Sequence, residues 1–169
     1  LDEAGGAAGV PVRVALKFDT GMSRLGFHAD EAQSVADALD GLEHVRAVLA
    51  CSHLATADDP AQAEYALEQG VRFARILQTL HGRGLDVRGS LANSGAIFGH
   101  PGLHHDLQRP GIALYGGNPF HGTDWASKGQ GLRQAMDVSS RLVQTRTIPA
   151  GQSVSYGRTF TAPRDMRIG

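Results

Sequence analysis

The sequence predicts an α/β fold in which half of a (β/α)₈ barrel is followed by the first strands of a β domain. Two observations support this prediction. Over residues 12–115, short apolar runs alternate with patterns of helical periodicity, which is the rhythm of a parallel sheet with crossover helices. From residue 138 onward, apolar and polar residues alternate, which indicates antiparallel strands. We therefore expect the barrel part at residues 1–125 and the start of the β domain at residues 126–169.

The first strand–helix–strand unit has the clearest pattern. Residues 12–18 (VRVALKF) are β-branched and apolar, as in a buried parallel strand, and the turn sequence DTG follows them. Residues 29–42 carry small and aliphatic side chains at helical spacing, which predicts an amphipathic helix. Residues 45–51 (VRAVLAC) then predict a second buried strand.

The next units are predicted from weaker patterns. Pro60 favours a helix start, and the glycines within residues 82–84 favour its end. The apolar stripe expected along this helix consists of Leu67, Gly70, Val71, Ala74 and Leu77. Residues 87–92 predict a third strand followed by a short helix, and residues 111–115 (GIALY) predict a fourth strand.

The character of the chain changes after this fourth run. Residues 116–131 are rich in glycine and polar side chains, so they are a candidate boundary. Residues 138–148 alternate between apolar and polar, and residues 153–157 (SVSYG) form a second β segment. Gly157 indicates a bend next to Tyr156, whose side chain either packs or presents its phenol to a substrate.

Composition excludes several classes of protein. The chain has 169 residues, of which 41% are apolar and 20% charged, as in an ordinary globular protein. A net charge of −1 does not favour nucleic acid or an anionic membrane as a partner, and no apolar run is long enough to span a bilayer. The single cysteine, Cys51, excludes an intrachain disulfide and fits a reducing compartment. The start at Leu1 and the stop at Gly169 are interpreted as those of a fragment cut at both ends.

Polar residues follow each predicted strand. They include Arg24 after the first strand, His53 after the second, Asn93 and Ser94 after the third, and Arg109 before the fourth. In a (β/α)₈ barrel the carboxyl ends of the strands share one face, where active sites lie. An open doubly wound sheet is the alternative, but no GxGxxG motif follows the first strand.

Each of these residues also fits a structural role. Asn93 or Ser94 either caps a helix or, with the amides that follow, binds a phosphate. Arg109 either forms a surface ion pair or holds a heteroatom of a ligand. Lys17, within the first apolar run, is either a Schiff-base lysine of lowered pKa or a structural partner of Arg24.

Two further groups carry weaker signals. Cys51 and His53 lie two residues apart, but no local motif supports a nucleophile pair. His100, His104 and His105 lack the regular ligand spacing of metal sites, so a solvated loop is the preferred interpretation and no metal is expected.

Five blocks of the sequence together resemble the alanine racemase family. The blocks are LKFDTGMSRLGF (16–27), CSHLATADD (51–59), LANSGAIF (91–98), RPGIALYG (109–116) and SVSYGRTF (153–160). They follow the family's order and separations and cover most of the chain. The family's members are pyridoxal 5′-phosphate enzymes with an N-terminal (β/α)₈ barrel and a C-terminal β domain. The resemblance implies that this chain is the second half of the barrel and the first strands of the β domain.

The resemblance implies a binding site for pyridoxal phosphate. Arg109 would hydrogen-bond the pyridine nitrogen, and His53 would pack against the ring. The positions implied around the phosphate, or as nearby backbone, are Asn93, Ser94, Gly111 and Ile112. Because a guanidinium donates a hydrogen bond but gives up no proton, we expect Arg109 to limit charge build-up in the ring and to disfavour side reactions.

The resemblance also implies the catalytic groups. Tyr156 would be one of two acid/bases and would act in the site of the other subunit of a homodimer. The second is the lysine that the family joins to the cofactor, and this chain has no matching block. Arg24 would meet the substrate carboxylate. Lys17 would correspond to a lysine that is often carbamylated and braces Arg24, which removes it as the Schiff-base candidate.

The implied reaction is the interconversion of L- and D-alanine in the cytoplasm, supplying D-alanine for peptidoglycan. A racemase for serine, lysine or several amino acids is one alternative. A non-catalytic pyridoxal-phosphate-binding barrel is another, although it would need neither Tyr156 nor a β domain. We expect the isolated chain to be inactive, because the covalent lysine and half of the barrel are missing.

Overall fold

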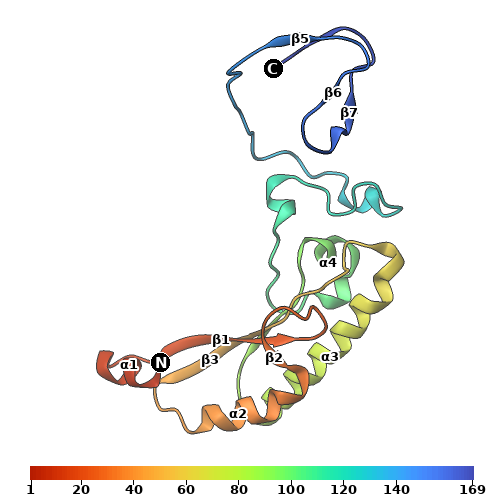
Figure 1. The fold of residues 1–169 in the computed structure, drawn as a ribbon. Helices are drawn as coiled ribbons and strands as arrows, with labels where there is room; N and C mark the ends of the chain where they lie inside the picture. Colours follow the sequence, from red (N-terminus) through yellow and green to blue (C-terminus); the bar gives the residue numbers. More distant parts are fainter. The chain divides into compact units, whose positions relative to one another are not determined.

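The computed structural model describes residues 1–169 and divides into two compact units, Leu1–Met136 and Asp137–Gly169 (Figure 1). Each unit has its own strands and its own internal contacts. The domain boundary expected after residue 125 stays a prediction. None of the helices has the length and apolar character that crossing a membrane requires.

The first unit contains a four-stranded sheet whose paired strands are all parallel. Its strands, in the spatial order β2-β1-β3-β4, are Phe27–His28, Val12–Asp19, Val45–Cys51 and Arg88–Ser90. The α-helices of this unit are α1 (Asp2–Ala8), α2 (Ala32–Asp40), α3 (Ala63–Gly82) and α4 (Ser94–Gly99). Its 3-10 turns are Ala29–Glu31, Pro60–Gln62, Pro101–Leu103, Ile112–Tyr115 and Ala126–Gly129. The strands β1, β3 and β4 are neighbours joined by helices, which is the topology expected of the barrel segment that the sequence predicts.

Strands β1 and β3 confirm the predictions made for residues 12–18 and 45–51. The short helix predicted near residue 93 is also present as α4, and Asn93 caps it by accepting from the Ala96 amide at 3.1 Å. The third strand is shorter than predicted, because the ladder with β3 ends at Ser90. Helix α1 has no counterpart in the sequence prediction. Its Asp2 carboxylate accepts from the His44 amide at 2.6 Å, a contact between distant residues that the sequence does not indicate.

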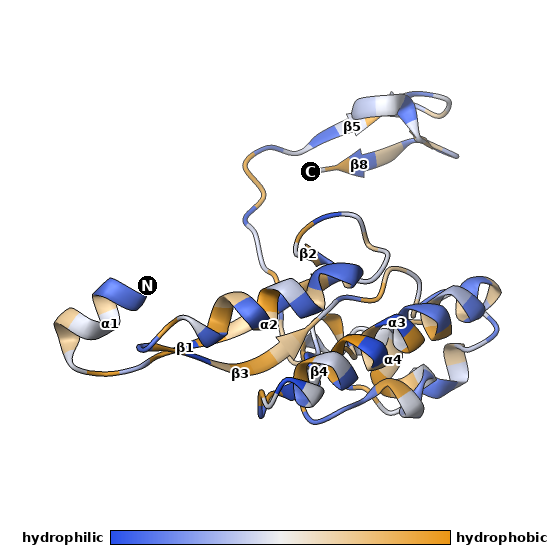
Figure 2. Ribbon diagram, turned by 90° about the horizontal axis from the view of Figure 1, so that it is seen from below, coloured by the Kyte–Doolittle hydropathy of each residue, from blue (hydrophilic) through white to orange (hydrophobic).

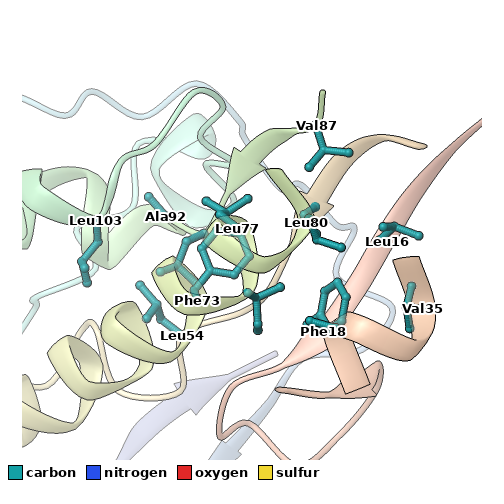
Figure 3. Packing of buried hydrophobic residues seen from close by; sticks show 14 of the residues in the cluster. Leu16, Phe18, Val35, Leu54, Phe73, Leu77, Leu80, Val87, Ala92 and Leu103 are labelled. Atoms are coloured by element: carbon teal, nitrogen blue, oxygen red, sulfur yellow. The ribbon is translucent and has the colours of Figure 1, made fainter. Parts of the chain in front are cut away.

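One hydrophobic core lies between the sheet and the helices α2 and α3 (Figure 3). Leu16 and Phe18 point from β1 toward Val35 of α2 and toward Phe73 and Leu80 of α3. Figure 2 shows hydrophobic residues along β3, whereas the helices α2 and α3 carry both hydrophobic and hydrophilic residues. Fully burying one such side chain contributes about 1.5–3 kcal/mol, so this layer is the main source of stability in the unit.

The buried face of α3 differs from the predicted stripe. Gly70 and Leu77 are buried as expected, but Ala74 is exposed, and Leu67 and Val71 are 52% and 53% exposed. The residues that face the core are Ala66, Gln69, Gly70, Phe73, Ile76, Leu77 and Leu80. The prediction was wrong because it ranked residues by apolarity alone. The true face includes the polar Gln69, whose amide finds partners in the fold.

The predicted fourth strand at residues 111–115 is also wrong. This segment is a 3-10 turn in which the Leu114 amide donates to the Gly111 carbonyl at 3.0 Å and the Gly117 amide to the Ile112 carbonyl at 3.1 Å. A strand needs a neighbour to pair with, and no strand of this sheet pairs with the segment. Local hydrogen bonds therefore satisfy its backbone instead.

The second unit contains two short antiparallel pairs. Strand β5 (Arg146–Ile148) pairs with β8 (Met166–Ile168), and β6 (Ser153–Val154) pairs with β7 (Phe160–Thr161). A 3-10 turn at Tyr156–Arg158 joins β6 to β7. The predicted antiparallel character is confirmed, but residues 138–145 form no strand. Their apolar side chains have nothing to cover them, and Val143 is 99% exposed.

Candidate functional site

The carboxyl ends of the parallel strands β1, β3 and β4 place the candidate residues along one edge of the sheet. Lys17 of β1 pairs in register with Cys51 of β3, which pairs in turn with Ser90 of β4. Lys17 points to the opposite face of the sheet from Leu16 and Phe18, because side chains alternate along a strand. The loops that follow these strands therefore start side by side.

A cavity of about 440 Å³ lies at this edge. It is lined by all six residues predicted to bind a cofactor: His53, Asn93, Ser94, Arg109, Gly111 and Ile112. Four residues that the sequence reasoning did not select complete the lining, namely Asp58, Gly95, Asn118 and Pro119. Asp58 and Gly95 lie within two of the quoted blocks, 51–59 and 91–98, and this is the signal that the sequence holds for them.

Ser94 organises one end of this cavity. Its hydroxyl oxygen accepts from the amides of Gly111 at 2.8 Å and Ala113 at 3.3 Å, which leaves the hydroxyl hydrogen free to donate. The amides of Gly95 and Ile112 have no acceptor within the protein. Three donors thus belong to one wall of the cavity. This donor set suits a ligand group that only accepts hydrogen bonds, such as a phosphate.

Arg109 is fixed by oxygens of two strand ends. Its guanidinium donates to the hydroxyl of Ser90 and to the carbonyl of Ser52, and its amide donates to the Ala92 carbonyl at 2.9 Å. Ser90 in turn donates its hydroxyl to the Leu107 carbonyl at 2.8 Å. No carboxylate forms an ion pair with Arg109. Its charge is therefore uncompensated by the chain, and it is held in place as a hydrogen-bond donor lining the cavity.

Burial, together with nearby cations, lowers the pKa values of two groups at this edge. Burial, with the nearby cations of Arg109, Lys17 and Arg24, lowers the pKa of His53, so its imidazole is neutral at pH 7. Burial is also the main cause that lowers the pKa of Lys17, and Arg109 and Arg24 act in the same direction. The Lys17 amine is consequently easier to deprotonate than an ordinary lysine.

Arg24 lies on the loop after β1, next to a second, open cavity of about 620 Å³. The carboxylate of Asp19 holds this loop by accepting from the amides of Gly21 at 2.8 Å, Met22 at 2.9 Å and Arg24 at 3.2 Å. These backbone donors lower the pKa of Asp19. A small hollow is lined by Lys17, Arg24 and His53 together, so it adjoins both predicted sites.

Tyr156 lies in the second unit, in the turn between β6 and β7. Its side chain is 97% exposed. The residues around it have unusual backbone angles: φ is +62° at Ser155, +68° at Gly157 and +51° at Arg158. Non-glycine residues at such angles cost about 1–3 kcal/mol each and are concentrated at functional positions.

The weaker candidates have separate environments, and the solvated loop preferred for the three histidines is wrong for His100, which is buried. His104 bonds the Ile97 carbonyl at 3.0 Å, His105 packs edge-on against Phe73, and His100 packs against Trp125. No group of His, Cys, Asp and Glu side chains is arranged to hold a metal ion. Cys51 is a free thiol and has no hydrogen bond with His53.

Three helix residues that the sequence reasoning missed contact both loops of this edge. Tyr65, Gln69 and Arg72 of α3 bond the segments that follow β1 and β3. The signal for Gln69 was available in the sequence. It is a polar residue three positions after Ala66 and four before Phe73, which places it on the helical face that those two residues bury.

Two family models match the chain. The alanine racemase N-terminal domain matches residues 1–119, and the alanine racemase C-terminal domain matches residues 135–169. Among curated relatives, the alanine racemase of Nitratidesulfovibrio vulgaris strain DP4 is 53% identical over 158 residues, which cover 94% of this chain and 42% of the relative. The alanine racemase of Lawsonia intracellularis is 38% identical over 160 residues, covering 95% of this chain and 42% of the relative.

Solved structures give the same result. The alanine racemase from D-cycloserine-producing Streptomyces lavendulae has a TM-score of 0.76 and 32% identity, covering 98% of this chain and 44% of that chain. The alanine racemase of Bartonella henselae, solved with covalently bound pyridoxal phosphate, has a TM-score of 0.67 and 30% identity over 98% of this chain and 44% of that one. The chain thus spans about two fifths of the length of the curated relatives it matches.

Proposed function

The chain belongs to the alanine racemase family, and on this premise we propose that it forms part of a pyridoxal-phosphate-dependent alanine racemase. The whole protein would interconvert L- and D-alanine and supply D-alanine for peptidoglycan. It would act in the cytoplasm as a homodimer. The observation that carries the proposal is the single cavity lined by His53, Asn93, Ser94, Arg109, Gly111 and Ile112.

The residues of this cavity fit the proposed cofactor. The free hydroxyl hydrogen of Ser94 and the amides of Gly95 and Ile112 would hold its phosphate. Arg109 would donate to the pyridine nitrogen, and the neutral ring of His53 would pack against the pyridine ring. When bound, pyridoxal phosphate makes the α-proton of an amino acid removable by delocalising the charge left on the α-carbon.

Racemisation requires a proton to leave one face of the α-carbon and another to arrive on the opposite face. We assign one of these acid/base roles to the phenol of Tyr156, acting in the site of the partner subunit. Its exposure and the strained turn that carries it support this assignment, because a group that serves another subunit must project from its own. The other role belongs to a lysine outside this chain. Arg24 would bind the substrate carboxylate.

Lys17 is proposed to be carbamylated. Only a neutral amine reacts with carbon dioxide, and burial lowers the pKa of Lys17. The carbamate would convert a cation beside Arg24 and Arg109 into an anion, so it would replace repulsion by attraction. In this form Lys17 would brace Arg24.

The role of Arg109 is tested by Arg109→Glu in the full-length protein that contains this chain. A glutamic acid can share a proton with the pyridine nitrogen, whereas a guanidinium does not. We expect slower racemisation and more transamination side product, measured as pyruvate formed per racemisation event. An unchanged ratio of pyruvate to racemised alanine would contradict the assigned role.

The substrate is tested with a panel of amino acids on the same full-length protein. We expect alanine to give the highest kcat/KM, and serine and lysine to be the informative competitors. Faster turnover of another amino acid would replace alanine as the substrate. If the protein binds pyridoxal phosphate but racemises none of them, the non-catalytic barrel is the correct alternative.

A further inference from the structure

One face of α3 contacts the two loops that follow β1 and β3, which carry Arg24 and His53. Tyr65, Gln69 and Arg72 are four and three residues apart, so they lie on the same side of the helix. They bond backbone carbonyls of Gly21, His53 and Thr20, respectively. None of the three was selected by sequence, and none is among the residues that line the proposed cofactor cavity.

Tyr65 and Arg72 hold the loop that carries Arg24. The Tyr65 hydroxyl donates to the Gly21 carbonyl at 2.8 Å, and the Arg72 guanidinium donates to the Thr20 carbonyl at 2.8 Å. Arg72 is itself kept in place by Glu68, at 2.9 Å, and lies over the Tyr65 ring at 5.6 Å.

Gly21 permits this close approach. A side chain there would begin 2.4 Å from the Tyr65 hydroxyl and 3.1 Å from the Arg72 guanidinium, and φ at Gly21 is +135°. The Arg24 loop is held by hydrogen bonds to both its amides and its carbonyls. Asp19 accepts from its amides, and α3 donates to its carbonyls. Both constraints act within five residues of Arg24.

Gln69 joins this loop to the one that carries His53. Its side chain is fully buried, donates to the His53 carbonyl at 3.0 Å and to the Thr20 hydroxyl at 3.3 Å, and accepts from the Ala55 amide at 2.8 Å. The Thr20 hydroxyl also bonds the Ser52 hydroxyl at 2.8 Å. A buried amide with all these partners fixes the spacing between the two loops, because shifting either one would leave a polar group unpaired.

We propose that Tyr65, Gln69 and Arg72 are positioning residues that hold the Arg24 loop in register with the His53 loop. The inference rests on the proposed function, since it assigns substrate binding to Arg24 and cofactor packing to His53. Through Tyr65 and Arg72, α3 sets the affinity for the substrate carboxylate. Through Gln69 it couples that affinity to the cofactor site.

The test uses Tyr65→Phe and Arg72→Met in the full-length protein. Arg75→Met is the matched control, because Arg75 is exposed on the same helix and its side chain contacts neither loop. Each test variant loses one hydrogen bond to the Arg24 loop. We expect KM for alanine to rise about 3- to 10-fold with kcat within about 2-fold, since the loss acts on binding in ground state and transition state alike. The dissociation constant for pyridoxal phosphate should stay within about 2-fold, and Arg75→Met should change neither value.

Hydrogen exchange of residues 20–26, measured on the cofactor-free protein, supplies a readout that needs no activity. We expect faster exchange in Tyr65→Phe and Arg72→Met than in Arg75→Met. Gln69→Met should accelerate exchange in residues 53–56 as well and weaken cofactor binding several-fold. If Gln69→Met fails to fold, Tyr65→Phe still tests the positioning role, because it removes a single oxygen atom.

The two readouts separate the possible failures. Unchanged exchange and unchanged KM in Tyr65→Phe and Arg72→Met would overturn the positioning role and leave the racemase assignment intact. Faster exchange in the variants of a protein that racemises no amino acid would reject the racemase assignment. It would still support the role of Tyr65 and Arg72 in holding the Arg24 loop. A rise in KM in Arg72→Met without faster exchange of residues 20–26 would overturn the role of Arg72 toward Thr20.

Discussion

The loop that carries Arg24 and the turn that carries Tyr156 present their side chains in opposite ways. The first is held by neighbouring Asp19, which accepts from its amides, and by the distant helix α3, which donates to its carbonyls, and glycine occupies its most restricted position. The second is held by its own strand pair, and two of its three positive φ positions are occupied by the non-glycine residues Ser155 and Arg158. The comparison shows that a side chain can be positioned either by contacts from a distant helix or by a short turn with few contacts. Both segments contain a non-glycine residue at positive φ, which in the first is Ser23 (φ +55°).

The largest expected effect comes from removing the exposed phenol. Tyr156→Phe in the full-length protein should lower kcat for alanine by about 10²–10⁴-fold, the usual contribution of a general acid or base. Because the side chain is 97% exposed, the unfolding midpoint should not move. Circular dichroism at a fixed wavelength follows racemisation, and a rate within a few-fold of the parent would remove Tyr156 from catalysis.

Gly21→Ala would break the tertiary arrangement of the Arg24 loop. Backbone strain costs about 1–3 kcal/mol, and the lost bond from Tyr65 costs about another 1 kcal/mol. We expect the free energy of unfolding, from urea titration, to fall by about 2–4 kcal/mol.

Gly84→Ala is the control, since φ is +80° there but nothing lies within 4 Å of an added Cβ. It carries the backbone strain without the clash. If the two substitutions cost the same, the contact with α3 does not explain why residue 21 is glycine.

Asp19→Ala probes the other side of the same loop. Hydrogen bonds to a charged group contribute about 1.5–3 kcal/mol, so unfolding at pH 7 should become easier by an amount of this order. The backbone donors depress the pKa of Asp19 below its ordinary value of 3.8. Its contribution is therefore complete above that value and lost as the pH falls through the folded-state pKa.

The parent and Asp19→Ala should thus converge in stability at low pH. Urea unfolding at pH 7 and at pH 3 measures this convergence. A difference between the two proteins that does not shrink with acidification would show that the charge of Asp19 is unimportant.

The smallest effect is expected in the strained turn. Ser155→Gly should stabilise the second unit by about 1 kcal/mol, because Ser155 has φ +62° and glycine adopts this angle without the penalty of a Cβ. Racemisation should fall modestly, since Tyr156 would be held less firmly. Thermal unfolding measures the expected gain in stability, and kcat measures the expected fall in racemisation. A destabilised variant would mean that the turn stores no strain at Ser155.

Much of the lining of the proposed cofactor cavity follows from the sequence. Residues 12–18 and 45–51 are recognisable as parallel strands from their own composition, and polar residues mark their carboxyl ends. Parallel strands joined by helices place those ends at one edge, so residues as distant as His53 and Ile112 meet in one cavity. Local pattern and chain connectivity predict the shared edge for His53, Asn93, Ser94 and Arg109, whereas only the family resemblance implied Gly111 and Ile112.

The tertiary structure alone decided what holds these residues in place. Residues 111–115 have the composition of a strand but form a 3-10 turn, because pairing depends on a neighbour that no local pattern encodes. The buried face of α3, and with it the reach of Gln69 to Thr20 and His53, was likewise set by what the helix packs against. Periodicity shows that a helix has a buried face, but hydrogen bonds between residues about 50 positions apart form only once the chain has brought both partners together.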